Sequence, residues 1–112
     1  MEEWPERREQ LVEELRIAER ARDLLAGLEQ RLDDNDRSDL QEHLGRLDQL
    51  EESLPEGRIV RLLVEDATKQ ARTRGRGKAG SVASRCRSKS EGRISRLRGI
   101  IEREDALASK EE

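Results

Sequence analysis

The residues with the clearest chemical potential form a basic segment over residues 72–93, RTRGRGKAGSVASRCRSKSEGR. This segment contains eight arginines and lysines but only one acid, Glu91. An arginine can donate two parallel hydrogen bonds to one phosphate, and closely spaced cations can contact several phosphates together. Glycines in such a segment also let a ligand approach the backbone closely. The composition therefore predicts a phosphate-binding surface.

The predicted surface extends beyond this segment, because residues 69–98 contain 11 bases and one acid. The predicted contact residues are Lys69, Arg72, Arg74, Arg76, Lys78, Arg85, Arg87, Lys89, Arg93 and Arg96. Four cations fall near one side of the last expected helix, namely Lys89, Arg93, Arg96 and Arg103. Segment and helix would then form one continuous basic surface.

The nucleic acid that such a surface would bind is indicated by what the chain lacks. It has no Phe, no Tyr and one Trp, so it has no aromatic set for stacking single-stranded bases. Binding of a duplex by its shape, through phosphates and 2′-hydroxyls, is favoured instead. Arginine-rich helices with glycine breaks are typical of RNA binders that become ordered on contact, so RNA is favoured over DNA. The alternatives are an acidic protein partner, or pairing between the acidic and basic parts of the chain itself.

The other chemically distinctive side chains point to packing rather than catalysis. Cys86 lies between two arginines and is expected to be an exposed thiol, either unremarkable or more acidic than usual. His43 is expected to pack near a leucine face, and Trp4 to cover one end of a helical bundle. No nucleophile elbow, paired catalytic carboxylates or metal-ligand spacing stands out. We therefore expect a non-enzyme without cofactor or metal.

Charge divides the chain into two unlike parts. Residues 1–57 hold 18 acids and 8 bases, net −10, whereas residues 58–112 hold 8 acids and 15 bases, net +7, and the sum is −3. This asymmetry predicts an acidic helical hairpin over 1–57 that serves oligomerisation, followed by a basic helix–loop–helix contact region over 58–112.

The pattern of apolar residues predicts four helices. Leu11, Ala18, Leu25 and Leu32 recur every seven residues in a helix over 5–32. A second helix is expected over 39–54 after a Ser38–Gln41 capping box, and a third over 58–72, with a strand over 58–64 as the alternative. The glycines at 75, 77 and 80 predict a loop over 73–87. Ser88 and Glu91 match a capping box for a last helix over 89–108.

These elements predict an all-α fold. Only 32% of the residues are hydrophobic, which is too few for a thick globular core. Two helices joined by a short turn favour an antiparallel hairpin, and a hairpin cannot cover both of its own apolar stripes. We therefore expect a homodimer, or a tetramer, in which hairpins complete a coiled coil or four-helix bundle, with the basic loop and C-terminal helix attached.

Two short stretches resemble known families. Residues 24–54, LLAGLEQRLDDNDRSDLQEHLGRLDQLEESL, resemble the Rop family of plasmid copy-control proteins, which are dimeric helical hairpins that bind RNA. No RNA-contacting residue is carried over from that family. Residues 87–98, RSKSEGRISRLR, are similar to the arginine-rich silencing suppressors of the cucumovirus type, which bind duplex RNA as dimers.

The main expectation is thus a homodimeric protein that binds duplex or structured RNA. The resemblance of residues 87–98 implies a virus-encoded suppressor of RNA silencing as an alternative. A second alternative is a structural or adaptor coiled-coil protein whose basic half docks on an acidic protein.

The sequence also bears on location. It contains no apolar run near 18 residues, and its first residues, MEEWPERREQ, are polar and acidic. We expect neither a membrane span nor a signal peptide. With a single cysteine, a cytoplasmic or nuclear location is expected.

Overall fold

A computed structural model describes residues 3–34, 36, 38–70 and 77–111 of the chain. Within these ranges the chain forms four α-helices and one short 3-10 helix, without a strand. The elements are α1 (Trp4–Asp33), α2 (Leu40–Leu50), η1 (Glu51–Ser53), α3 (Gly57–Gln70) and α4 (Gly77–Glu111). The predicted all-α fold is confirmed, and residues 58–64 belong to a helix rather than to a strand.

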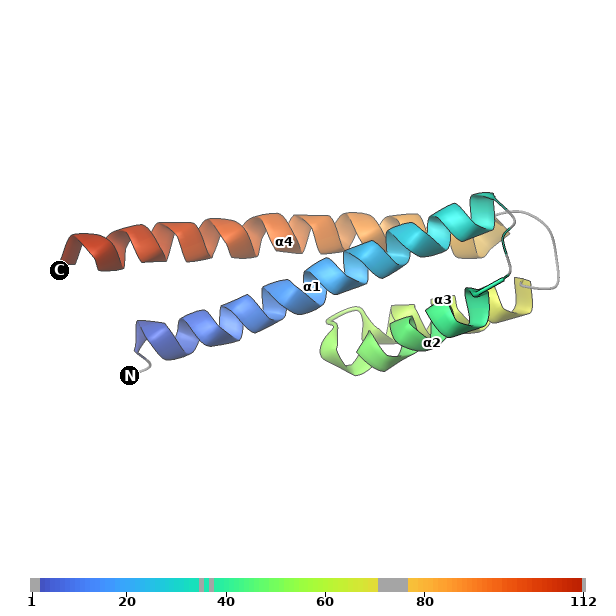
Figure 1. Cartoon of the computed structure of the whole chain (residues 1–112), viewed down its shortest axis with the longest axis horizontal. Helices are drawn as coiled ribbons and strands as arrows, with labels where there is room; N and C mark the ends of the chain where they lie inside the picture. Colours follow the sequence, from blue (N-terminus) through green and yellow to red (C-terminus); the bar gives the residue numbers. More distant parts are fainter. Residues whose placement is uncertain (1–2, 35, 37, 71–76, 112) are drawn as a thin grey trace.

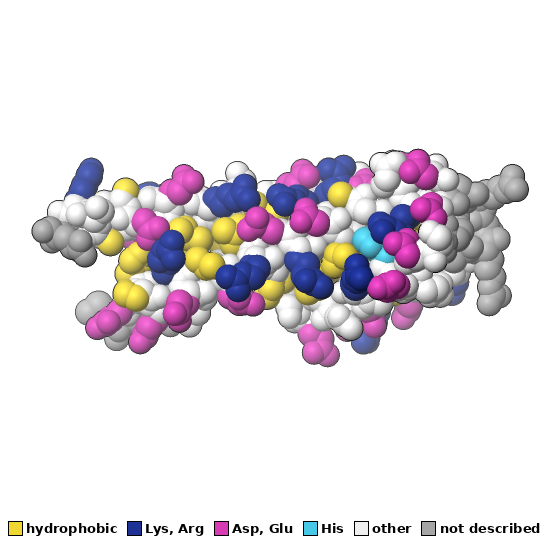
Figure 2. Space-filling model, in the orientation of Figure 1, with side chains coloured by type: hydrophobic (Ala, Val, Ile, Leu, Met, Phe, Trp, Pro, Cys, Tyr) yellow, Lys and Arg dark blue, Asp and Glu magenta, His cyan; other side chains and the backbone are white. Residues whose placement is uncertain are grey.

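The two long helices, α1 and α4, run antiparallel along the molecule, whereas α2 and α3 form a short hairpin beside one half of them (Figure 1). The molecule is a rod with extents of 59 × 21 × 20 Å. One half of the rod is a four-helix bundle, and the other half consists of α1 and α4 alone. Figure 2 shows hydrophobic side chains between α1 and α4 along that second half.

The core forms where the four helices meet. Three of the four heptad positions predicted in α1, Ala18, Leu25 and Leu32, are fully or almost fully buried, whereas Leu11 is half-buried. Leu25 and Leu32 join buried residues of the other helices, including Leu44 of α2 and Leu63 of α3. The apolar stripes of α1 and α2 are therefore covered by α4 and α3 of the same chain. The bundle that we expected two copies to form is completed within one copy.

This core draws on both halves of the sequence. Residues on either side of position 57 contribute to it, and α1 from the acidic half lies along α4 from the basic half. The assignment of oligomerisation to residues 1–57 and of contact to 58–112 stays a prediction about roles.

The loop expected over 73–87 is wrong for residues 77–87, and residues 73–76 lie outside the described part of the chain. Helix α4 begins at Gly77 and continues without a break to Glu111. Ala79, Gly80 and Ala83 are buried near its start. Small buried residues let neighbouring helices approach closely, and this packing outweighs the cost of about 1 kcal/mol for a glycine in a helix.

Both predicted capping boxes are wrong. Ser88 and Glu91 lie inside α4, where the Glu91 carboxylate accepts a hydrogen bond from Arg87, one turn before it. The residue that precedes α2 is Asp39, and the Ser38 hydroxyl donates to Asp36 instead of capping the helix. Asp39 accepts two hydrogen bonds of 2.7 Å from the Arg31 guanidinium, which lowers the pKa of Asp39 to about 2. This pair closes the turn between α1 and α2.

The turn between η1 and α3 depends on a glycine. A Cβ atom at Gly57 would collide with the backbone carbonyl of Glu51. The second helix, expected over 39–54, is shorter than predicted: α2 ends at Leu50, η1 ends at Ser53, and α3 begins at Gly57.

His43 is buried between α2 and α1, as its expected packing role requires. Its ring Nε2 contacts the backbone carbonyl of Leu24, and a Cβ at Gly27 would lie 2.9 Å from its Cε1 atom. Desolvation lowers the pKa of His43 below its usual 6.5, although the Leu24 carbonyl acts in the opposite direction. Arg31, Asp39 and Arg46 also act on this ring through their charges.

We expect this burial to make folding stability depend on pH. Below pH 6.5 the unfolded chain protonates His43 before the folded chain does, so the free energy of unfolding falls as pH falls through this range. Urea unfolding at pH 7.5 and 5.5 measures the loss. His43→Gln keeps an N–H donor for Leu24 but does not titrate, so it should lose less stability over the same range. Equal losses for the two proteins would contradict the expectation.

Candidate nucleic-acid interface

The cations of α4 fall into two groups, one with acidic partners in the rest of the chain and one without. Three arginines turn toward the rest of the molecule and form ion pairs with acids far away in the sequence. The pairs are Arg87–Glu29, Arg93–Glu56 and Arg98–Glu19. The Arg98–Glu19 pair has an N–O distance of 3.1 Å. Attraction between the acidic and basic parts of the chain, one of the alternatives from the sequence, therefore contributes to the fold.

Arg87 and Arg93 were both predicted to bind phosphate, and both already have carboxylate partners. Arg87 donates to Glu29 and also to Glu91, at 3.0 Å for the second bond, and its hydrogen bond with Glu29 raises its pKa. The side chain of Arg93 is only 14% exposed and donates to Glu56. These guanidinium groups hold α4 against α1 and against the start of α3.

The second group of cations is exposed to solvent, and its first two members border the groove between α3 and α4. We call it the outer basic stripe, and it consists of Arg85, Lys89, Arg96 and Arg103. Steps of four, seven and seven residues place these positions within about 40° of one another around the helix. All four side chains are exposed. None of them forms an ion pair with another described residue.

Glycines lie within the stripe and leave space over the helix. A Cβ atom at Gly92 or at Gly99 would meet no other atom within 4 Å. A ligand that contacts Lys89 and Arg96 can therefore approach the backbone between them. The stripe is an accessible row of cations on a long helix.

The other predicted contact residues lie before this stripe in the chain. Lys69 is exposed in the last turn of α3. Lys78 falls in the first turn of α4, seven residues before Arg85 and so on the line of the stripe, but its side chain is not described. The three remaining predicted residues, Arg72, Arg74 and Arg76, lie outside the described residues.

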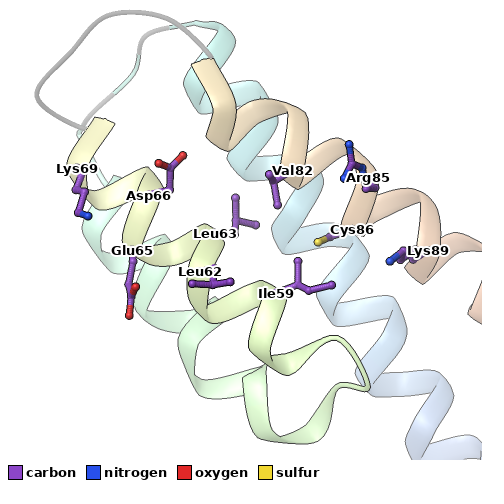
Figure 3. Close-up of a pocket in the computed structure, with 10 residues that line it drawn as sticks. All are labelled: Ile59, Leu62, Leu63, Glu65, Asp66, Lys69, Val82, Arg85, Cys86 and Lys89. Atoms are coloured by element: carbon purple, nitrogen blue, oxygen red, sulfur yellow. The ribbon is translucent and has the colours of Figure 1, made fainter.

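A groove of about 460 Å³ runs between α3 and α4 next to the stripe (Figure 3). Leu63, Val82 and Cys86 are among the apolar residues that line it. Glu65 and Asp66 of α3 and the cations Lys69, Arg85 and Lys89 are its charged lining residues. The sequence contained one signal of this groove. The apolar residues of α3 occupy two neighbouring flanks, and this arc is too wide to be buried by a single packed face.

Cys86 differs from our expectation. The residue is buried, with 3% of its surface exposed, in the wall of the groove. Burial raises the pKa of its thiol, and the nearby Glu56 carboxylate acts in the same direction. Arg85 and Lys89 oppose this change without overcoming it. The expected exposed thiol is therefore a buried one that resists ionisation.

Trp4 covers the far end of the rod. Its indole N–H donates to the Asp105 carboxylate at 3.0 Å, and Arg8 donates to the same carboxylate at 3.1 Å. The start of α1 is thereby fastened to the end of α4.

The described ranges show neither a metal-binding cluster nor a membrane-spanning helix. They contain no group of three or more His, Cys, Asp or Glu side chains that could hold a metal ion. No helix there combines the length and the apolar character needed to cross a membrane. The sequence matches no model of a known protein family, and comparison with curated proteins and with solved structures finds no significant match.

Proposed function

We propose that this protein is a non-catalytic binder of duplex or structured RNA and that the outer basic stripe of α4 is its contact surface. One observation carries the proposal: four exposed cations without an acidic partner share one face of a long helix, while three other arginines of the same helix are paired internally. From Arg85 to Arg103 the stripe spans 19 residues, a rise of about 27 Å along the helix.

A row of this kind suits the backbone of a nucleic acid. Phosphates repeat along each strand, and a helix with cations about 6 and 10 Å apart can contact several of them without adjusting its own shape. Guanidinium groups at positions 85, 96 and 103 can each bind one phosphate through two hydrogen bonds. The absence of Phe and Tyr supports recognition by charge and shape.

The acids near the stripe restrict the direction of approach. Glu65 and Asp66 line the same groove as Arg85 and Lys89, and like charge would repel a phosphate there. The RNA would therefore lie over α4 and extend toward Arg103 rather than toward α3.

A charge-matched pair of variants tests the proposal. Arg96→Ala/Arg103→Ala removes two stripe cations, and the control Arg7→Ala/Arg20→Ala removes two exposed arginines of α1. Fluorescence anisotropy with labelled duplex RNA at 50 and 200 mM salt should show an affinity about 10- to 100-fold lower for the stripe variant. Its salt dependence, as the slope of log K against log salt, should decrease by about 2.

The control variant should bind almost as well as the original protein. Equal losses for both variants would show a response to net charge alone and would contradict the assigned surface. No binding of duplex RNA at low salt, together with tight binding of polyglutamate, would replace the proposal with an acidic protein partner. Duplex DNA and single-stranded RNA, measured in parallel, test the preference for duplex RNA.

A further inference from the structure

The outer face of α3 is left uncovered by the rest of the chain. Ile59 is 38% exposed and Leu62 is 57% exposed, which makes them two of the three large hydrophobic side chains that are exposed in the described residues. Both line the groove between α3 and α4, whose α4 wall includes Val82 and Cys86 (Figure 3). Exposed apolar side chains beside an apolar groove are typical of a protein–protein contact.

The charges around Leu62 indicate what this face would bind. Arg58 lies four residues before Leu62, and Glu65 and Asp66 lie three and four residues after it. None of these three side chains forms an ion pair within the described chain. The face thus has a basic residue before its apolar centre and two acids after it, with the exposed Lys69 following in the last turn of this helix of 14 residues.

We infer that this face binds a second copy of the same chain, with the two α3 helices antiparallel and Leu62 near the two-fold axis. A two-fold interface brings the same surface of each copy together with its direction reversed. Arg58 of each copy then opposes Glu65 and Asp66 of the other. The same surface carries both the cation and the acids of these ion pairs. A second copy of the chain is therefore complementary in charge to the first.

The groove accommodates the apolar centre of this contact. Its volume of about 460 Å³ has room for a leucine side chain of the second copy, above Val82 and Cys86. Burying Leu62 and Ile59 removes apolar surface from water, which favours association. In such a dimer α4 lies beyond the groove, so that Arg96 and Arg103 stay uncovered in both copies.

This interface differs from the one that the sequence suggested. The hairpin of α1 and α2 was expected to pair with a second hairpin, but α3 and α4 of the same chain occupy that role. The inference does not depend on the proposed function, because the contact involves protein surfaces only and is tested without nucleic acid.

A charge-exchange experiment tests the inference directly. Arg58→Glu places two acidic ends opposite each other in a dimer, and Glu65→Arg/Asp66→Arg places two basic ends there. Sedimentation equilibrium of the full chain should show a dimer for the original protein and a dimer dissociation constant at least about tenfold higher for each variant alone. An equimolar mixture of the two variants should recover a heterodimer, because each end again meets its opposite charge.

Two leucine variants add a matched control. Leu62→Glu should abolish the dimer, whereas Leu107→Glu changes the third exposed hydrophobic residue, 50% exposed on the two-helix half, and should leave the dimer intact. All of these side chains are at the surface, so circular dichroism should show unchanged helix content. A monomer at the highest soluble concentration, no recovery in the mixture, or dissociation by Leu107→Glu rather than by Leu62→Glu would overturn the inference.

Discussion

Replacing Leu28 with alanine is expected to lower the free energy of unfolding by about 3 kcal/mol. Leu28 has no exposed surface and belongs to the cluster to which all four helices contribute. Its truncation removes buried methyl groups and leaves a cavity that a closely packed bundle can fill only in part. Because a domain of this size is stable by about 5–15 kcal/mol, this is a large fraction of the total. Urea or thermal unfolding followed by circular dichroism measures it.

Leu107→Ala is the matched control for this substitution. Leu107 is half exposed on the part of α4 that α2 and α3 do not cover, so its truncation should cost well under 1 kcal/mol. A similar, small loss for both variants would contradict a core shared by four helices.

Replacing Glu56 with glutamine is expected to cost about 3 kcal/mol. The side chains of Glu56 and Arg93 are 11% and 14% exposed, and they form an ion pair between the start of α3 and the middle of α4. The Nη1 atom of Arg93 is buried without a hydrogen-bond partner in the described structure. A neutral residue at position 56 would leave this guanidinium charge buried and without its carboxylate. Chemical unfolding of the single variant measures the cost.

The double variant Glu56→Gln/Arg93→Met separates the buried charge from the loss of the contact. Methionine keeps an unbranched apolar chain and removes the charge, and replacing a buried ion pair by apolar side chains is often neutral or stabilising. The double variant should therefore be more stable than Glu56→Gln alone. If the two substitutions simply add, Arg93 is not held by this carboxylate.

Helix positions were predictable from the sequence because they depend on local periodicity. The helix expected over 5–32 is observed over Trp4–Asp33, and the one expected over 58–72 is observed over Gly57–Gln70. Periodicity does not reveal which helices pack against each other through their apolar stripes. Leucines of α1 suit α2 or α4 equally well, and only the structure shows that α1 lies along α4.

The start of α4 was not predictable because packing overrides intrinsic preference there. Glycines at 77 and 80 disfavour a helix in isolation, yet Ala79 and Ala83 are completely buried in the bundle. The same burial accounts for Cys86, whose two flanking arginines suggested an exposed thiol. Whether a small residue is exposed or buried depends on partners far away in the chain.

The sequence predicted which cations belong to the candidate site, but not which of them are paired with carboxylates and which are exposed. Sequence shows that Arg87, Arg93 and Arg96 are close together, but it does not show that the first two meet Glu29 and Glu56. Once a helix runs unbroken from residue 77, the spacing of Arg85, Lys89, Arg96 and Arg103 places them on one face. The exposed face of α3 could not be recognised without knowing which flank the bundle covers.

The seam between α1 and α4 has a consequence for synthesis on the ribosome. Its contacts join distant parts of the chain, since Arg8 meets Asp105 97 residues later. At 5–20 residues per second, about 4–16 s separate the completion of α1 from that of α4. During this interval the apolar stripe of α1 has only the hairpin of α2 and α3 to cover it. The nascent chain is therefore expected to bind chaperones until α4 is made, and a polypeptide released before α4 would be prone to aggregation and degradation.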